Sequence, residues 1–301
     1  MRTSASTFRG TYVTAAAILF VMIASVARGQ TPPPPAPTQP ETTQPDASQA
    51  EVTQPERADP DARIDPLQPD FNLAALPTTL RMPPHKWAFR ITHRFNRPIG
   101  QGDVGDFFSD FFGFDSSANV GLELRYGLMR GTQVGVHRTS DRTIQLFLQH
   151  NLRNQRDGAR FGLDALATFE GQHNLRDEYQ GAFGLVASKT LARRIALYAE
   201  PILMTNSNPL GDSDDTTLLV GVGGRLRVLP SMYLLGEITP RIVGYDGGVD
   251  QMSFAIEMRP GGHLFQVNVS NGWGTTLGQL TRGGITNDNW YIGFNIARKF
   301  F

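Results

Sequence analysis

The stretch Trp290–Phe301, WYIGFNIARKFF, alternates between two kinds of side chain. One alternating register is apolar until a charge near its end, whereas the other register is small or polar. Side chains alternate faces along a strand, so this pattern predicts a β-strand with one apolar face. Its length suits one tilted crossing of a bilayer, roughly 9–11 residues, and aromatic rings at both ends match the two membrane interfaces. The stretch favours a strand of a membrane β-barrel over an edge strand of a soluble sandwich.

The composition excludes several classes of function. The 301 residues contain no cysteine, which excludes disulfides, thiolate metal sites and a cysteine nucleophile. Lys+Arg and Asp+Glu both number 28, so no net charge indicates nucleic acid as a partner. Glycine is abundant at 31 residues. Together with the aromatic residues, this suits many strands joined by tight turns.

The composition also divides the chain into three parts. Residues 1–29 have the form of a cleaved secretory signal peptide, with a basic start, an apolar segment and small residues at its end. Residues 30–84 are rich in proline, threonine, glutamine and acids, which predicts a disordered linker, either passive or acting as a periplasmic spacer. Residues 85–301 carry the strand patterns. No later segment is a candidate transmembrane helix, so we expect any membrane insertion to use strands.

About twelve strands follow from the alternation and the turn signals. They are expected at 86–95, 118–126, 132–138, 143–151, 159–170, 179–190, 194–205, 216–228, 232–243, 251–258, 263–270 and 289–300. The odd-numbered connections are the longer ones, except the third, as in bacterial barrels with short periplasmic turns and long outer loops. We therefore predict an all-β fold, an up-and-down antiparallel transmembrane β-barrel of about 12 strands. Its expected location is the outer membrane of a Gram-negative-type bacterium, with the N-terminal tail and the C-terminus periplasmic.

Several stretches resemble a family of bacterial outer-membrane β-barrels known only as a domain of unknown function. These stretches are 93–95, 111–116 running into 120–127, 134–140, 236–240, 271–279 and 293–300. The resemblance implies a signal-bearing outer-membrane barrel without an established activity, and it transfers no functional residue. Ser117 departs from the glycine expected after Ser116. The final pair, Phe300 and Phe301, resembles the C-terminal signal of such barrels, which implies the barrel-assembly machinery as a partner.

The inward-facing register carries charges of both signs. The charges expected to line the lumen are Arg90, Arg94, Glu123, Arg125, Asp164, Arg225, Arg227, Glu237 and Glu257. Isolated charges are costly in a narrow interior, so opposite charges on neighbouring strands should satisfy one another. The first long loop is expected to add a plug or lid, or alternatively a lipid-contacting rim, built from Phe107, Phe108, Phe111 and Phe112. Such a filling would leave a twelve-stranded barrel little open bore.

Catalytic and metal sites find little support in the sequence. His137-Arg138-Thr139 is the nearest match to the His-x-Ser pair of membrane barrels that modify lipids. Threonine stands in place of serine, however, and no third partner is identifiable. The six histidines show no ligand spacing. Gly221-Val222-Gly223-Gly224 lies within a strand pattern, which favours a bulge or close packing over a phosphate-binding loop.

The sequence therefore predicts a non-enzymatic outer-membrane barrel without a cofactor or a metal. The predicted function is a narrow or plugged pore or carrier for small solutes. The alternative is a structural or ligand-binding barrel with a filled lumen, and a lipid-modifying enzyme is a distant third. Outer-membrane lipid and the barrel-assembly machinery are the expected partners. The sequence leaves the oligomeric state open.

Overall fold

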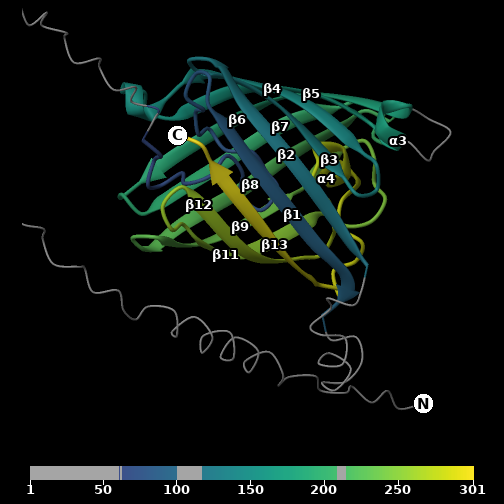
Figure 1. Ribbon diagram of the computed structural model, residues 1–301. Helices are drawn as coiled ribbons and strands as arrows, with labels where there is room; N and C mark the ends of the chain where they lie inside the picture. The colour runs from purple at the N-terminus through teal and green to yellow at the C-terminus, as the bar shows by residue number, and fades with distance from the viewer. Residues whose placement is uncertain (1–60, 62, 100–116, 209–214) are drawn as a thin grey trace, which may run out of the picture. The chain divides into compact units, whose positions relative to one another are not determined.

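The computed structural model describes residues 61, 63–99, 117–208 and 215–301, and the strands among them form an antiparallel β-barrel (Figure 1). In chain order the strands of the ring are β1 (Trp87–Pro98), β2 (Ala118–Met129), β3 (Thr132–Thr139), β4 (Ile144–Arg153), β5 (Gly162–Gly171), β6 (Asp177–Leu191), β7 (Ile195–Met204), β8 (Thr217–Leu229), β9 (Met232–Thr239), β11 (Gln251–Met258), β12 (His263–Ser270) and β13 (Tyr291–Lys299). A three-residue strand, β10 (Arg241–Val243), pairs with β8.

Each strand of the ring pairs with its two neighbours, and β1 pairs with β13 to join the first strand to the last (Figure 1). In that pairing Ala88 lies opposite Lys299 and Arg94 lies opposite Gly293. The sheet therefore closes into an up-and-down barrel of twelve strands. The predicted fold class is confirmed, and the strand boundaries differ from the predicted ones by a few residues.

The barrel is apolar outside and polar inside. In β4, Leu146 and Leu148 are 43% and 44% exposed, whereas Gln145 and Gln149 are buried. The final strand shows the same order, because Asn295 is buried while the apolar residues on either side of it are partly exposed. A soluble protein places its large apolar side chains in the interior, so this arrangement indicates that hydrocarbon surrounds the barrel. The apolar face read from the final strand is the outer face.

The helices of the described part are short. They are the 3-10 turn η3 (Gln155–Asp157), α3 (Gln172–Leu175) and α4 (Leu277–Arg282). In the parts of the chain that the structure describes, none is long and apolar enough to cross a membrane. The helices α3 and α4 lie in the fifth and eleventh connections, two of the long connections at one end of the barrel. At the other end the connections between β2 and β3 and between β8 and β9 are tight.

Residues 68–83 are buried without a break, and we call them the plug segment. They belong to the same compact unit as the strands. The prediction of a linker extending to residue 84 is therefore wrong for this segment. Four of its apolar side chains, Phe71, Leu73, Leu76 and Met82, are at most 3% exposed. Their burial offsets the entropy of ordering the chain, which the surrounding prolines and polar residues could not do. Residues 1–60 lie outside the described residues, so the signal peptide and the rest of the linker stay predictions.

Candidate functional site: a lumen filled from both ends

The plug segment reverses direction inside the barrel. The amide of Leu73 donates to the carbonyl of Leu76 over 2.7 Å, and Asn72 and Pro77 form an antiparallel bridge. We call this turn, residues 72–76, the plug tip. A buried turn leaves amide and carbonyl groups that no neighbouring strand satisfies. The inward side chains of the barrel wall supply the missing partners.

Glu237 of β9 satisfies the amides of the plug tip. Its carboxylate accepts hydrogen bonds of 2.9–3.1 Å from the backbone amides of Ala74, Ala75 and Leu76. Consecutive amides that point the same way form a cradle for an anion, and hydrogen bonds to a charged acceptor are stronger than neutral ones. A single carboxylate of the wall thus satisfies three amides of the plug tip.

The carbonyls of the plug tip face cationic side chains of the wall. Arg90 donates to the carbonyl of Ala74 over 2.6 Å, and Arg94 reaches the same oxygen over 3.3 Å. Arg225 donates to the carbonyl of Asn72 over 2.9 Å. Three arginines of the inward register therefore bind the backbone of the plug segment. These arginines can donate to backbone carbonyls only because the plug segment lies in the lumen.

Eight of the nine charges expected in the lumen are buried, namely Arg90, Arg94, Glu123, Arg125, Asp164, Arg225, Glu237 and Glu257. The ninth, Arg227, is partly exposed at a strand end and donates to the carbonyl of Pro230. Arg90 of β1 lies opposite Glu123 of the neighbouring β2, as expected, but the ion pairs of Arg125 and Arg225 differ from that expectation. Arg125 pairs with Glu123 of its own strand at 2.8 Å, and Arg225 of β8 pairs with Glu257 of the non-adjacent β11 at 3.0 Å.

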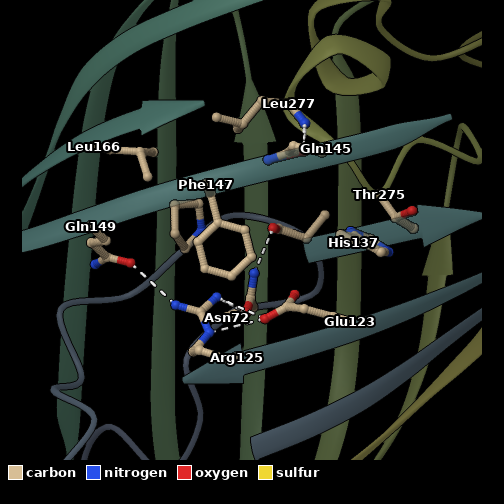
Figure 2. A pocket seen from close by; sticks show the side chains of 12 residues that line it. Asn72, Glu123, Arg125, His137, Gln145, Phe147, Gln149, Leu166, Thr275 and Leu277 are labelled. Atoms are coloured by element: carbon tan, nitrogen blue, oxygen red, sulfur yellow. Dashed lines mark hydrogen bonds and ion pairs between the residues drawn. The ribbon is translucent and has the colours of Figure 1, made fainter. Parts of the chain in front are cut away.

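Arg125 lies at the contact between the wall and the plug (Figure 2). Its guanidinium carbon is 4.4 Å from the ring centre of Phe147 in the wall and 5.0 Å from that of Phe71 in the plug segment. The space left beside it is a cavity of about 30 Å³, which Thr275 and Leu277 of the eleventh connection also line. Such a cavity has room for a few water molecules at most. The plug leaves no passage for a sugar or an amino acid here.

The helix α4 fills the lumen from the opposite end. Residues 277–281 are buried, and Thr276 and Gln279 form a capping box at its start. The amide of Leu277 donates to Gln145 over 2.9 Å, and that of Gly278 donates to Glu170 over 3.1 Å. The structure thus shows two fillings, neither of which is the one expected from Phe107, Phe108, Phe111 and Phe112. Those phenylalanines lie outside the described residues, so a lid in the first loop stays a prediction.

Three salt bridges hold the plug segment near the end where it joins β1. Arg81 donates to Asp61 over 2.7 Å and also binds the carboxylate of Asp157 in η3. The hydrogen bond from Arg81 holds the pKa of the Asp157 carboxyl below its usual value. Lys299 of the final strand binds Asp70 over 2.7 Å. The plug segment is therefore fixed to η3, in the connection between β4 and β5, and to the last strand.

The weak catalytic candidate does not form a reactive pair. His137 and Thr139 are both buried on the inward side of β3. The hydroxyl of Thr139 donates to the carboxylate of Asp141, and no hydrogen bond joins it to His137. A nucleophile needs its base within hydrogen-bond reach. This geometry does not pair the imidazole of His137 with the hydroxyl of Thr139.

The two terminal phenylalanines occupy different environments. Phe300 is 55% exposed, as a ring facing lipid would be. Phe301 packs against an apolar cluster that includes Phe71 and Met82 of the plug segment. Their role as a signal for the barrel-assembly machinery stays a prediction. The structure adds that the last residue touches the plug.

The glycines of β8 make room for the plug segment. A Cβ atom at Gly221 would lie 2.8 Å from Leu76, and one at Gly223 would overlap Leu73. Both contacts are closer than real Cβ atoms tolerate, so a side chain at either inward position would force the facing leucine of the plug segment to shift. Of the two expectations for this glycine-rich stretch, close packing is confirmed.

A side chain at Gly223 should therefore loosen the plug. We expect Gly223→Val to destabilise the folded barrel by about 1–3 kcal/mol, as overpacking does in other cores. The same change at Gly224 is the matched control, because this residue points outward and a Cβ atom there would lie 3.4 Å from its nearest neighbour. The temperature at which the barrel loses its compact form on a detergent gel measures the effect. Equal temperatures for the two variants would contradict the packing argument.

A closed ring of strands, apolar outside and polar inside, defines a membrane β-barrel protein. The profile of the membrane-bound β-barrel domain family DUF5777 matches residues 70–300. The chain belongs to this family. The match begins inside the plug segment, so the family domain includes most of the plug as well as the twelve strands.

Comparison with solved structures returns outer-membrane porins. The NanC porin superposes with a TM-score of 0.48 at 7% identity, over 72% of this chain and 99% of the other. The outer membrane protein Omp33 of Acinetobacter baumannii gives a TM-score of 0.41 at 10% identity, over 74% of this chain and 100% of the other. No curated protein sequence matches the chain. No substrate is inferred from these similarities.

Proposed function

We propose that this protein is a plugged pore of the outer membrane. The plug segment closes the lumen at rest, and small solutes pass only when the plug segment moves. The observation that carries the proposal is the binding of the plug tip by Glu237, because its contacts are hydrogen bonds that water can replace. In this proposal the N-terminal tail and the C-terminus are periplasmic, so the plug segment enters the lumen from the periplasmic side.

The charged side chains of the barrel wall favour a lumen that can open for solutes over one that is permanently filled. A buried ionic network is seldom more stable than apolar packing of similar volume. A barrel that served only as a scaffold would be more stable with an apolar interior. Here Arg90, Arg94 and Glu237 line the wall, and they would stay favourably hydrated if the plug segment left and water entered. The same side chains would then give the opened channel a polar surface.

A reversible tether between the plug segment and the wall tests the proposal. The hydroxyls of Thr79 and Ser188 are in contact, and the natural chain has no cysteine. The variant Thr79→Cys/Ser188→Cys should therefore form one defined disulfide. We expect the oxidised variant to show no openings in a planar bilayer, because its plug segment cannot leave. Reduction should restore the rare openings of the unmodified protein.

The single variant Thr79→Cys is the control, since it cannot form the tether and its current should not respond to the reductant. Identical currents before and after reduction of the double variant would show that the plug segment does not gate the barrel. If the natural chain also never opened, the filled barrel with a structural role would be the better account. The tight fit of α4 at the opposite end is the observation that favours this second function.

A further inference from the structure

Exposed cations cluster at the end of the barrel where the plug segment joins β1. They lie on three successive turns, between β2 and β3, between β4 and β5, and between β6 and β7. We call this cluster the basic rim, and it consists of Arg130, Arg153, Arg156, Arg160, Lys189, Arg193 and Arg194. The only acid in the same stretches (127–131, 152–161 and 188–194) is Asp157, and Arg81 binds it. The rim therefore has a strong excess of positive charge.

Large apolar side chains alternate with these cations and are exposed as well. Leu128, Met129, Leu152, Phe161 and Leu191 have exposed fractions between 38% and 56%. Apolar residues next to long basic side chains are typical of the boundary between hydrocarbon and water, where the apolar part enters the membrane and the charge reaches the headgroups. The basic rim thus lies at the level of one row of lipid headgroups.

A hollow of about 380 Å³ lies between the first two of these turns. Arg81, Arg130 and Arg153 line it, together with Asn151, Asn154 and the acid Asp157, which Arg81 binds. Its volume is in the range of sites that bind small molecules, roughly 300–1,000 Å³. The guanidinium of Arg130 is 3.5 Å from Asp157 and 3.8 Å from Asp61, while that of Arg153 lies over the ring of Phe161. Neither arginine makes a close bidentate pair with these carboxylates. The guanidinium N–H groups of both arginines can therefore bind an added anion.

We propose that the basic rim binds anionic phospholipids, with a headgroup phosphate in the hollow between Arg130 and Arg153. The acyl chains would lie against Leu128 and Leu152, which are exposed on the turns that form the hollow. A soluble polyanion would match the charge but not these apolar side chains. The opposite end of the barrel differs, because exposed acids such as Asp177 are mixed there with arginines. The inference is independent of whether the barrel conducts.

Native mass spectrometry of the full-length protein in an uncharged detergent tests this inference. The protein is titrated with phosphatidylglycerol and, separately, with phosphatidylcholine, and the bound lipid is counted at each concentration. We expect Arg130→Gln/Arg153→Gln to weaken phosphatidylglycerol binding roughly 10- to 30-fold, because each cation near an anionic lipid surface contributes roughly a five-fold factor. The variant Arg138→Gln/Arg176→Gln is the matched control, since it removes two exposed arginines from the opposite end.

Loss of affinity in the rim variant alone would support the proposal. Equal affinity in the two double variants would overturn it, and so would binding of phosphatidylcholine as tight as that of phosphatidylglycerol. A third arm adds inorganic phosphate, and displacement of the lipid at similar phosphate concentrations would show a site for free anions instead. Arg130 contributes to ion pairs, so the variant Arg160→Gln/Arg193→Gln repeats the test at exposed arginines elsewhere on the rim. It should weaken binding several-fold in a barrel whose plug contacts are intact.

Discussion

Removal of the plug segment, residues 68–83, is expected to convert a nearly non-conducting barrel into an open pore. Twelve strands enclose a wider interior than the side-chain-filled barrels of eight strands, although a narrower one than the porins of 16–18 strands. In the intact protein the cavity beside the plug tip has a volume of about 30 Å³. Without the plug segment, water should hydrate Arg90, Arg94 and Glu237, so the strands should still close. We expect the conductance in planar bilayers to rise by at least about one order of magnitude.

Two other deletions make this result specific. Deletion of residues 32–55, in the predicted linker, should leave the conductance at the level of the intact protein. Deletion of Gly102–Phe112 should raise the conductance only if the phenylalanine-rich first loop also covers the barrel. A large and steady current through the intact protein would contradict the plugged state. If the barrel without its plug segment stayed closed, α4 or the first loop would be the barrier.

The second large effect is expected at the ion pair between Arg225 and Glu257, whose side chains are both fully buried. Arg225→Met should destabilise the barrel by about 3–5 kcal/mol, because it leaves the carboxylate of Glu257 buried without its cation. It also removes the donor to the carbonyl of Asn72 in the plug tip. The midpoint of urea-induced unfolding, followed by the change in gel mobility, measures the loss.

Two variants serve as controls for that result. Arg225→Met/Glu257→Leu should recover much of the stability, since it removes both charges together. Arg227→Met removes an arginine two residues further along the same strand, where the side chain bonds only to the partly exposed turn at Pro230. It should cost no more than about 0.5 kcal/mol, as for most surface substitutions. If the single and double changes of the buried pair cost the same, the charge of Glu257 would not be the cause.

The twelve strands could be predicted from the sequence because their signal is local. Because lipid lies outside the barrel and polar side chains lie inside it, apolar and polar residues alternate along every strand with a period of two. Each strand shows this pattern in its own sequence, whatever its neighbours are. Leu146 and Leu148, which flank polar positions in β4, illustrate the rule. The short turns at one end of the barrel add a second local signal. Eight of the expected luminal charges followed from the same alternation.

The plug segment could not be recognised in this way, because its folded structure depends on contacts with residues that are far away in the sequence. Leu76 and Glu237 are 161 positions apart, and nothing near residue 76 indicates that a carboxylate will meet its amide. The largely apolar run FNLAAL (71–76) was a usable signal, but prolines on both sides and acids before it masked it. The pair of Arg225 and Glu257 was missed for a related reason, since β8 and β11 are separated by β9 and these side chains meet only inside the lumen. The capping box at Thr276 could have revealed α4 in the eleventh connection.

The plug tip has a consequence for the junction between β1 and β13. The carbonyl of Ala74 accepts hydrogen bonds from Arg90 of the first strand and from Asn295 of the last. Lys299 of the last strand adds its bond to Asp70. A seam held only by the hydrogen bonds of two strands could part sideways into the lipid. Here the plug segment ties both edges together from within, so the wall can split along this line only after the plug segment has withdrawn.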